Sequence, residues 1–408
     1  MVAQSGGPTV AINATLAGVL NGVLQSDRYE ICYGAIHGVQ GILKEDYINL
    51  NEMIPDKATM EKLKLTPAMY LGSCRYKLPA PSVDERPYQF IFAQFKQLNI
   101  GAFFYIGGND SMDTVAKLAD YAEKIGSKVR IIGVPKTIDN DLVITDHTPG
   151  YGSAAKYVAA TMLEIAHDTY IYDLKSVTIV EIMGRDAGWL TAAAALARNE
   201  YNSAPHFIYL PEVAFDKEKF IADVKAMLKT RNSIIIAVSE GIRDAEGNYI
   251  TAGEAKADQF GHVQLSGAGK ALEYLVKEEI GVKVRSVEIS VLQRSASHMA
   301  SYTDIRESFN QGQAAVQLAQ NGMTAEMVTI ERLSDVPYVI KFGHTDVRAV
   351  ANAAKSIPRE WINEAGNDVT PALIRYMMPL IQGEVSHTYA GGIPSYLGVE
   401  HLKPKNWQ

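Results

Sequence analysis

The chain has 408 residues, 47% of them hydrophobic and 21% charged, which is typical of a globular protein with about two domains. Its formal net charge of −7 argues against a nucleic-acid partner, because nucleic acids are bound largely through basic contacts to phosphates. No apolar run approaches the ~20 residues of a membrane span, so we expect no membrane partner. The two cysteines, Cys32 and Cys74, exclude a disulfide framework and favour a reducing cytoplasm.

Strand-like and helix-like segments alternate along the chain. Only Met1 to Gln4 precede the first turn, which is short for a central strand of ~5–6 residues and compatible with further residues upstream. Short apolar runs predict strands over residues 30–34, 102–106, 129–134, 176–182 and 233–238. Apolar residues at helical spacing predict helices over residues 12–25, 89–98, 112–125 and 154–170. Because the strand runs are continuous rather than alternating, helices should cover both faces of mostly parallel sheets, which indicates a doubly wound α/β fold.

The first of three glycine-rich turns, Gln4 to Thr9, precedes the helix expected over residues 12–25. Its paired glycines, Gly6 and Gly7, let backbone N–H groups approach a phosphate closely, and a helix N-terminus favours an anion. An ordinary helix start would look the same, so this turn alone is a weak indication of phosphate binding.

The second turn, residues 105–111, again joins a strand to a helix. Gly107 and Gly108 would allow close approach to a phosphate, and Asp110 would lie near a metal ion or a leaving group. The alternative is structural, with Asp110 or Ser111 capping the helix.

The third turn, Gly133 to Asp141, carries the most chemistry. Pro135 should end the strand, because proline has no N–H to give to a sheet. Lys136 can neutralise phosphate charge, Asp139 can accept a proton from an attacking hydroxyl, and Asp141 can hold Mg²⁺. A charged turn after a strand is the alternative for this motif alone. Three such turns at successive strand ends favour phosphate binding, since ligands gather at the carboxyl ends of strands in open α/β sheets.

Seven motifs in a fixed order give the chain a specific resemblance. They are Ser5-Gly6-Gly7, Leu71-Gly72-Ser73-Cys74-Arg75, Gly107-Gly108-Asn109-Asp110-Ser111, Pro135 to Asp141, Met183-Gly184-Arg185, Ser239-Glu240-Gly241 and Gln293-Arg294. The chain resembles the phosphofructokinases, and in particular the branch of that family that uses pyrophosphate in place of ATP.

The resemblance implies the phosphofructokinase fold, with two Rossmann-like doubly wound domains that exchange segments. Residues 1–150 and roughly 293–343 would form the pyrophosphate domain, and residues 151–292 and roughly 344–408 the sugar-phosphate domain. It also implies a homodimer or homotetramer whose active site is shared between subunits. The implied reaction is reversible transfer of a phosphoryl group from pyrophosphate to the 1-hydroxyl of fructose 6-phosphate, in glycolysis or gluconeogenesis.

The resemblance also implies a role for each matching residue. Asp139 matches the general base, Arg75 an arginine that stabilises the transferring phosphoryl group, and Lys136 a lysine that compensates the charge of pyrophosphate. The implied fructose 6-phosphate residues are Thr137, Asp141, Met183, Gly184, Arg185, Glu240, Arg285 and Arg294. Of these, Arg285 would reach in from the neighbouring subunit. The implied pyrophosphate residues are Gly6, Gly7, Gly107, Gly108, Asp110, Ser111 and Lys136. The implied cofactor is Mg²⁺, near Asn109 and Asp110.

Three positions separate the alternatives within this family. Members that use ATP usually carry glycine where this chain has Asp110 and Lys136, so an ATP-dependent enzyme is the weaker alternative. The family usually has aspartate where this chain has Asn109, an amide that brings no charge to Mg²⁺. That departure leaves open a non-catalytic regulatory subunit, although Asp139, Asp141 and the other motif residues oppose it. A different sugar phosphate, such as sedoheptulose 7-phosphate, is a third alternative.

Overall fold

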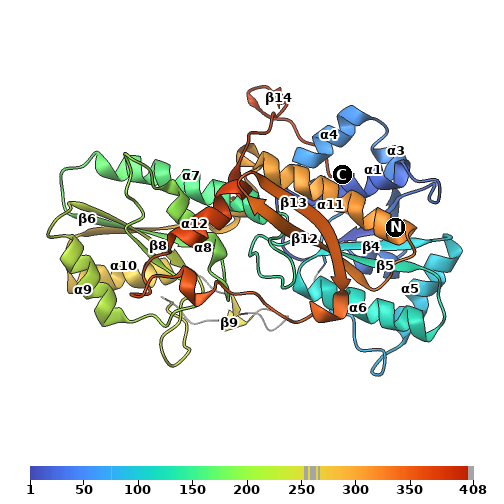
Figure 1. Cartoon of the computed structure of the whole chain (residues 1–408), viewed down its shortest axis with the longest axis horizontal. Coiled ribbons are helices and arrows are strands. Elements are labelled where there is room, and N and C mark those ends of the chain that lie inside the picture. Colours follow the sequence, from blue (N-terminus) through green and yellow to red (C-terminus); the bar gives the residue numbers. More distant parts are fainter. Residues whose placement is uncertain (75, 252–255, 258–262, 265–266, 403–408) are drawn as a thin grey trace.

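Two mostly parallel sheets with helices packed on them form the fold (Figure 1). The first sheet has 7 strands in the order β13-β12-β5-β4-β1-β2-β3, and the second has 4 in the order β11-β6-β8-β7. This arrangement confirms the predicted α/β class. Within the described chain, no helix is both long and apolar enough to cross a bilayer. The computed structural model describes residues 1–74, 76–251, 256–257, 263–264 and 267–402.

The strands of the two main sheets come from separate stretches of the chain. Those of the first sheet are β1 (Val2–Gln4), β2 (Tyr33–Ala35), β3 (Tyr47–Asn49), β4 (Ala102–Gly107), β5 (Arg130–Pro135), β12 (Glu326–Asp335) and β13 (Tyr338–Asp346). Those of the second are β6 (Ser176–Ile182), β7 (Phe207–Tyr209), β8 (Ser233–Ser239) and β11 (Lys283–Glu288). Two short antiparallel pairs add β9 (Lys256–Ala257), β10 (Val263–Gln264), β14 (Tyr389–Ala390) and β15 (Ile393–Pro394).

Helices connect and cover these strands. The α-helices are α1 (Ile12–Leu24), α2 (Val39–Leu43), α3 (Leu50–Met53), α4 (Lys57–Leu65), α5 (Arg86–Gln97), α6 (Asn109–Lys124), α7 (Tyr151–Tyr170), α8 (Trp189–Ala193), α9 (Lys217–Met227), α10 (Ala268–Glu279), α11 (Tyr302–Gln320) and α12 (Pro371–Met377). The 3-10 helices are η1 (Ala194–Ala197), η2 (Ser290–Arg294), η3 (Ser297–Met299), η4 (Val347–Ala349), η5 (Arg359–Trp361), η6 (Met378–Ile381) and η7 (Glu400–Leu402).

The central strands agree with the continuous apolar runs of the sequence. Every residue of β4, β6 and β8 is buried, as expected for strands covered on both faces. The strand predicted over residues 30–34 begins later, at Tyr33. Its preceding residues pair differently, because the backbone of Cys32 is hydrogen-bonded to Leu50 and Asn51. Pro135, expected to stop its strand, is the last residue of β5.

The segment after β13 divides between the two sheets, which differs from the predicted grouping of residues 344–408 with the second domain. Ile357, Leu373 and Met377 do pack in the core against α7 and α8. Val347 joins the core beneath the first sheet, and Leu402 packs against the core on its other side. The sequence of this segment has no motif that specifies a packing partner, so its division was not predictable.

Helices α1 and α11 cross unusually closely over the first sheet, and two glycines make this possible. A Cβ at Gly18 would lie 1.9 Å from the carbonyl oxygen of Phe309, and one at Gly312 would lie 2.2 Å from that of Thr15. Backbone oxygens cannot move aside as a side-chain terminus can, so only glycine permits this approach.

We predict that Gly312→Ala destabilises the protein. Alanine favours a helix over glycine by about 1 kcal/mol, but overpacking against a backbone costs about 1–3 kcal/mol, so the net effect should be a loss. Equilibrium unfolding in urea would measure it, with Gln317→Ala on the exposed face of α11 as the control, expected within about 0.5 kcal/mol of wild type. An alanine variant as stable as wild type would contradict the close crossing.

Candidate active site

Three loops meet at the carboxyl end of the first sheet, after the neighbouring strands β1, β4 and β5. The amide of Lys136 donates to the carbonyl of Gly107 over 2.9 Å, and the amide of Ser5 donates to that of Ile106 over 3.0 Å. The hydroxyls of Ser5 and Ser111 lie 2.5 Å apart. The three glycine-rich turns singled out in the sequence therefore lie side by side, as parallel strands require.

Lys136 connects the third turn to the first. Its side chain is only 2% exposed, and Nζ donates to the carbonyl of Gly7 over 2.8 Å. A Cβ at Gly6 would lie 3.2 Å from the same Nζ, so the glycine leaves room for the ammonium group. Burial lowers the pKa of Lys136 to about 8, although the nearby charges of Asp139 and Asp141 oppose that shift. The ammonium group is therefore placed where an anion would stabilise its charged form.

Two carboxylates stand beside this lysine in the same turn. The hydroxyl of Thr137 accepts a hydrogen bond from the amide of Asp139 over 3.1 Å, which holds the turn tight. Loss of hydration raises the pKa of Asp139. It also raises the pKa of Asp141 to about 7, with repulsion from Asp139 adding to the effect. A general base works best when its pKa lies close to the pH of the reaction, and burial moves both carboxyl groups in that direction.

The second sheet contributes two loops, after the neighbouring strands β6 and β8. The amide of Gly184 donates to Glu240 Oε1 over 3.3 Å, and the hydroxyl of Ser239 donates to the carbonyl of Gly184. A Cβ at Gly241 would lie 1.8 Å from the carbonyl oxygen of Arg185, so only glycine fits there. Burial raises the pKa of Glu240 to about 7, and the charge of Asp139 adds to the shift. Glu240 therefore lies within electrostatic range of Asp139 in the third turn.

The two sheets thus face each other across one charged site. Arg185 and Arg294 both lie close enough to Asp139 to lower its pKa, against the larger effect of burial. Arg294 Nη1 also lies 3.4 Å from where a Cβ on Gly7 would be, so this arginine reaches the first turn. The loops that the structure brings together carry many of the residues that the resemblance singled out: Gly6, Gly7, Gly107, Gly108, Ser111, Lys136, Thr137, Asp139, Asp141, Gly184, Arg185, Glu240 and Arg294. Asp110 and Met183 lie next to these loops in the sequence, and the roles of all these residues stay a prediction.

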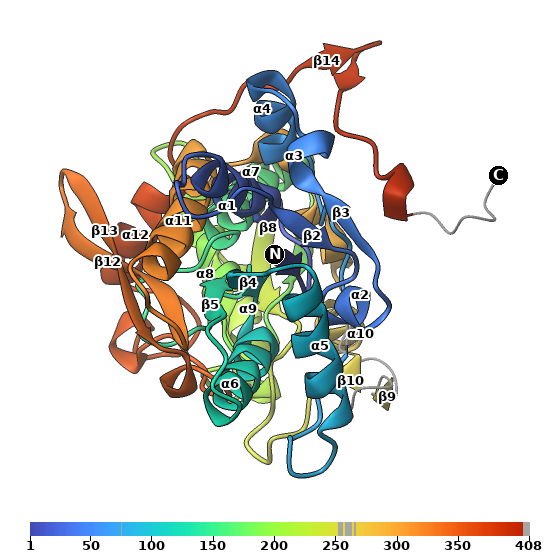
Figure 2. The same ribbon diagram turned by 90° about the vertical axis from the view of Figure 1, so that its right-hand side faces the viewer.

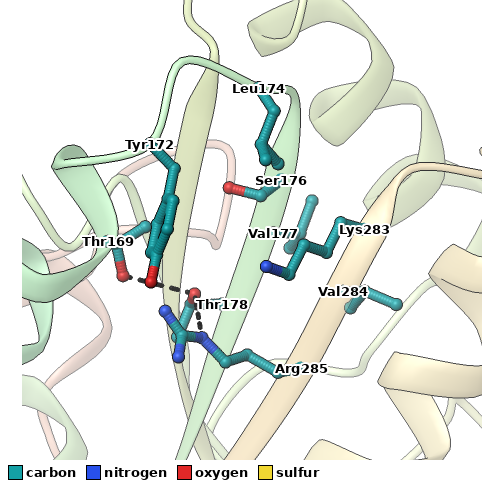
Figure 3. Close-up of a pocket in the computed structure, with 9 residues that line it drawn as sticks. All are labelled: Thr169, Tyr172, Leu174, Ser176, Val177, Thr178, Lys283, Val284 and Arg285. Atoms are coloured by element: carbon teal, nitrogen blue, oxygen red, sulfur yellow. Dashed lines mark hydrogen bonds between the residues drawn. The ribbon is translucent and has the colours of Figure 1, made fainter.

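Arg285 lies beside Thr178 in a small pocket between β6 and β11 (Figure 3). It is on the edge strand β11, opposite Thr178 of β6, and its guanidinium donates to Thr178 and forms an ion pair with Asp168 at 2.9 Å. The loop bearing Arg185 begins only after Ile182, four residues and roughly 13 Å further along β6. Within one chain, Arg285 therefore does not reach the site.

Asn109, at the start of α6, has a structural use that the sequence did not indicate. Its Nδ2 donates to the carbonyl of Ala353 over 2.7 Å, and its Oδ1 accepts from the amide of Asn352 over 2.7 Å. This side chain therefore ties the second turn to the segment after β13. Asp110, the next residue, is exposed. Arg75 lies outside the described residues.

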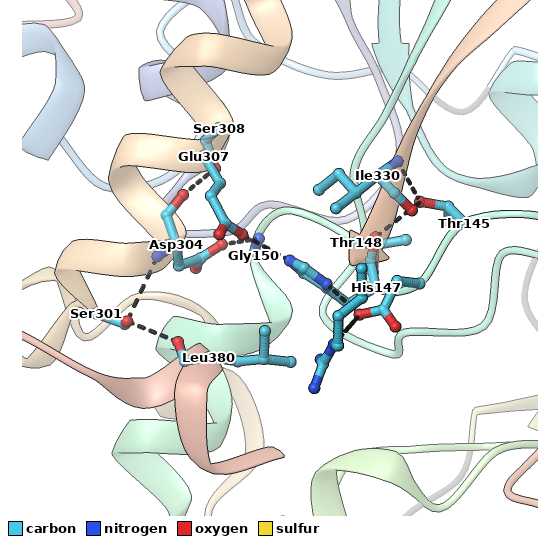
Figure 4. Close-up of polar contacts among 12 residues, drawn as sticks. Thr145, His147, Thr148, Gly150, Ser301, Asp304, Glu307, Ser308, Ile330 and Leu380 are labelled. Carbon is cyan, nitrogen blue, oxygen red and sulfur yellow. Dashed lines mark hydrogen bonds and ion pairs between the residues drawn. The ribbon is translucent and has the colours of Figure 1, made fainter. Parts of the chain in front are cut away.

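A buried charge network supports the segment that follows the third turn (Figure 4). His147 is 3% exposed, and its ring nitrogens lie 2.7 Å from Asp146 and 2.7 Å from Glu307. Burial disfavours the charged ring, but these two acidic partners prevail and raise the pKa of His147 to about 9. Arg332 pairs with Asp146 at 2.8 Å. Sequence analysis missed this network because Glu307 and Arg332 lie 160 and 186 positions from their partners His147 and Asp146 and show no motif spacing.

Other contacts hold the backbone of the third turn itself. Asn140 has a positive φ of 55°, and its Nδ2 donates to the hydroxyl of Tyr376 over 2.9 Å. That hydroxyl in turn donates to the carbonyl of Asp146 over 2.6 Å. The amide of Lys355 donates to the carbonyl of Asp141 over 2.7 Å. The turn is therefore fixed from both sides by segments of the chain that lie more than 200 positions later.

Comparison with known proteins gives a consistent set of matches. The family model described as "Phosphofructokinase" matches residues 1–319. A pyrophosphate–fructose 6-phosphate 1-phosphotransferase of Xanthomonas campestris is 41% identical, covering 98% of this chain and 96% of that protein. One of Methylococcus capsulatus is 39% identical, covering 97% and 94%. The crystal structure of a pyrophosphate-dependent phosphofructokinase from Nitrosospira multiformis is 37% identical, with a TM-score of 0.87 over 97% of this chain and 95% of that one.

We predict that Asp141→Asn stabilises the ligand-free protein above neutral pH. The folded pKa of Asp141 lies above its value of 3.8 in the unfolded chain, so its contribution to stability is present at low pH and is lost as pH rises through about 7. The amide mimics the protonated acid and removes this loss, raising the free energy of unfolding at pH 8 by roughly 1–3 kcal/mol.

Urea unfolding at pH 5 and pH 8 would measure this effect. Asp335→Asn is the matched control, because the Asp335 side chain is 55% exposed, and this variant should show no gain at pH 8. A lower stability of Asp141→Asn at pH 8 would mean that Asp141 is held ionised by its surroundings.

Proposed function

The chain belongs to the phosphofructokinase family, and from that premise we propose that it transfers a phosphoryl group from pyrophosphate to the 1-hydroxyl of fructose 6-phosphate. The products are fructose 1,6-bisphosphate and phosphate. The transfer is close to reversible and belongs to glycolysis or gluconeogenesis.

The observation that carries this proposal is the position of Lys136. Its ammonium group is buried, hydrogen-bonded to the first turn and adjacent to the Asp139–Asp141 pair. Burying an ammonium group away from water is costly unless a bound anion compensates its charge. Pyrophosphate supplies that anion in a compact form, without a nucleoside that needs a separate pocket.

The same region supports pyrophosphate over ATP. Asp110 is exposed at the N-terminal turn of α6, beside the Gly107–Gly108 turn. A carboxylate there would repel and crowd the α-phosphate of ATP. Pyrophosphate has no third phosphate and does not extend to this position. Lys136 holds the donor by charge, and Gly6, Gly7 and Ser111 bring backbone and hydroxyl donors to it.

Asp139 acts as the general base in this proposal. It accepts the proton of the sugar 1-hydroxyl while that oxygen attacks phosphorus in line with the leaving phosphate. Its raised pKa suits this task near neutral pH. Arg294, Arg185 and Glu240 hold the sugar phosphate, with Thr137 and Met183 beside the reacting end. The role of Arg75 in stabilising the transferring group stays an expectation from the family resemblance. Rate acceleration comes mostly from positioning and from charge neutralisation.

Among the described residues, no three Asp, Glu, His or Cys side chains are gathered closely enough to hold a metal ion by themselves. Mg²⁺ would therefore bind through Asp139 and Asp141, whose mutual repulsion a cation would relieve, together with phosphate oxygens of the substrate. Both polar atoms of Asn109 already bind backbone groups, so its part in metal binding would be secondary. When bound, Mg²⁺ neutralises negative charge on the phosphates.

The proposed active unit is a homodimer or a homotetramer in the cytoplasm. Arg285 is too far along β11 to serve its own chain, yet its guanidinium is partly exposed at a sheet edge. The guanidinium could enter the active site of a neighbouring subunit and bind the 6-phosphate of the sugar there, because its planar set of N–H donors matches phosphate oxygens. Among the described residues Cys32 and Cys74 are free and buried, which suits a reducing compartment.

A non-catalytic role is the weaker candidate. It would rest on Asn109 alone, and the structural contacts of that side chain give the asparagine another reason to be there. A site that no longer catalysed transfer would not need Lys136, Asp139 and Asp141 to remain together in a low-dielectric setting. No contact in the described chain favours ATP or another sugar phosphate.

We predict that purified protein forms fructose 1,6-bisphosphate from fructose 6-phosphate, Mg²⁺ and pyrophosphate, and does not use ATP at equal concentration. Asp139→Asn should lower kcat by about 10²–10⁴-fold while still binding the sugar phosphate, because a general base contributes that much. A coupled assay with each donor would measure both. Turnover with ATP alone would overturn the donor assignment. Sugar-phosphate binding without turnover would favour the regulatory alternative.

We predict that two inactive variants restore each other when mixed. Arg285→Ala lacks the shared arginine, and Asp139→Ala lacks the base, so a mixed dimer has one site with both residues intact if Arg285 acts across subunits. Random exchange of dimers should recover about a quarter of wild-type activity. Co-expression with two affinity tags and a donor assay would measure this. If Arg285 acted within its own chain, the mixture would stay inactive.

A further inference from the structure

The segment from His387 to Leu402 runs outside the two main sheets and has no part in the reaction proposed above. Figure 2 shows β14 projecting beyond α4 and the chain then descending past β3 to the short helix η7. Its polar contacts go to two places only within the described chain: the loop after Arg294 and the segment from Thr66 to Gly72.

At one end, His387 contacts the loop that follows Arg294. Its Nε2 lies 2.8 Å from the carbonyl oxygen of Ser297, three residues beyond that arginine, and its ring packs edge-on against Tyr396 at 6.1 Å. Ser297 is 1% exposed, and its hydroxyl donates to the carbonyl of Leu65. This end of the segment is therefore anchored to the loop that follows Arg294, the arginine proposed to hold the sugar phosphate.

At the other end, three contacts hold the segment from Thr66 to Gly72. The amide of Leu397 donates to Thr66 Oγ1 over 3.1 Å. His401 Nε2 donates to the carbonyl oxygen of Tyr70 over 2.6 Å, and the two rings lie 4.5 Å apart. The side chain of Leu402 lies 3.3 Å from where a Cβ on Gly72 would be.

The segment from Thr66 to Gly72, whose Tyr70 carbonyl binds His401, leads directly to the glycine-rich turns that we propose bind pyrophosphate. The amide of Leu71 donates to Gln4 Oε1 over 2.9 Å, so this segment is bound to the end of β1. Ser73 Oγ donates to the carbonyl oxygen of Gly6 over 2.7 Å, inside the first glycine-rich turn. Only three positions separate the carbonyl that His401 holds from the side chain that contacts Gly6.

We propose that residues 387–402 form a strap that positions the pyrophosphate side of the site, with His401 as its positioning residue. His401 fixes the carbonyl of Tyr70, and through the backbone of Tyr70 to Ser73 it sets where the Gly6–Gly7 turn meets the donor. We expect His401 to affect pyrophosphate binding, since its contacts lie next to the first glycine-rich turn. The strap is thus a positioning element, separate from the groups that touch the substrates.

This inference rests on the proposed function, and steady-state kinetics of the full chain separate the two. Loss of one hydrogen bond costs about 0.5–1.5 kcal/mol, so His401→Ala should raise KM for pyrophosphate by about 2–10-fold. KM for fructose 6-phosphate should change much less. His401→Gln keeps an N–H donor at this place and should recover part of the loss.

His344→Ala is the matched control. That histidine is partly exposed on β13, where its Nδ1 lies 3.0 Å from Glu326, and its replacement should leave both KM values unchanged. His387→Ala tests the other end and should affect KM for fructose 6-phosphate more than that for pyrophosphate.

Two results would overturn the strap. The first is an unchanged KM for pyrophosphate in a folded His401→Ala protein with a lowered Tm, which would make the contact purely structural. The second is an equal rise in both KM values. Absence of pyrophosphate turnover in the wild type would instead remove the proposed function, so the two failures are distinguishable.

Discussion

The turn from Lys136 to Asp141 carries three ionisable groups into a place where water solvates them poorly, and much of the structure serves to hold it there. Each charge alone would be costly to bury, and the opposite signs only partly compensate, as the displaced pKa values of Lys136 and Asp141 indicate. The scaffold around the turn makes this arrangement persist. Helix α11, strand β12 and helix α12 contribute Glu307, Arg332 and Tyr376 to that scaffold.

Function follows from the same constraint. Poorly solvated charges interact strongly with a ligand of opposite charge, because little water screens them. Groups that are already in position also need little rearrangement when the reaction proceeds. The glycines at positions 6, 7, 107 and 108 bring the backbone close, and the facing loops of the second sheet supply Arg185 and Glu240. In the proposed reaction, the donor binds at the loops of the first sheet and the acceptor at those of the second, which would bring the two reacting atoms together between the sheets.

The sequence predicted the parts of this arrangement that depend on local pattern. Continuous apolar runs identified β4, β6 and β8, because strands covered on both faces need no polar side. The glycine-rich turns and the Lys136–Asp141 cluster stood out because unusual residues lie close together in the chain. The His147 network and the strap of residues 387–402 could not be found this way. Their partners are 160 and 331 positions away, and each residue is ordinary in its own neighbourhood. The structural contacts of Asn109 were hidden for the same reason.

The most direct measurement is the proton exchange that accompanies pyrophosphate binding without metal, by calorimetry at pH 8 in buffers of different ionisation enthalpy. With a pKa of about 8, Lys136 is partly neutral in the free protein, and the bound anion should restore its charge. We predict that wild type takes up about half a proton more per bound pyrophosphate than Lys136→Met at saturation. Equal proton exchange in the two proteins would contradict the central role given to this buried lysine.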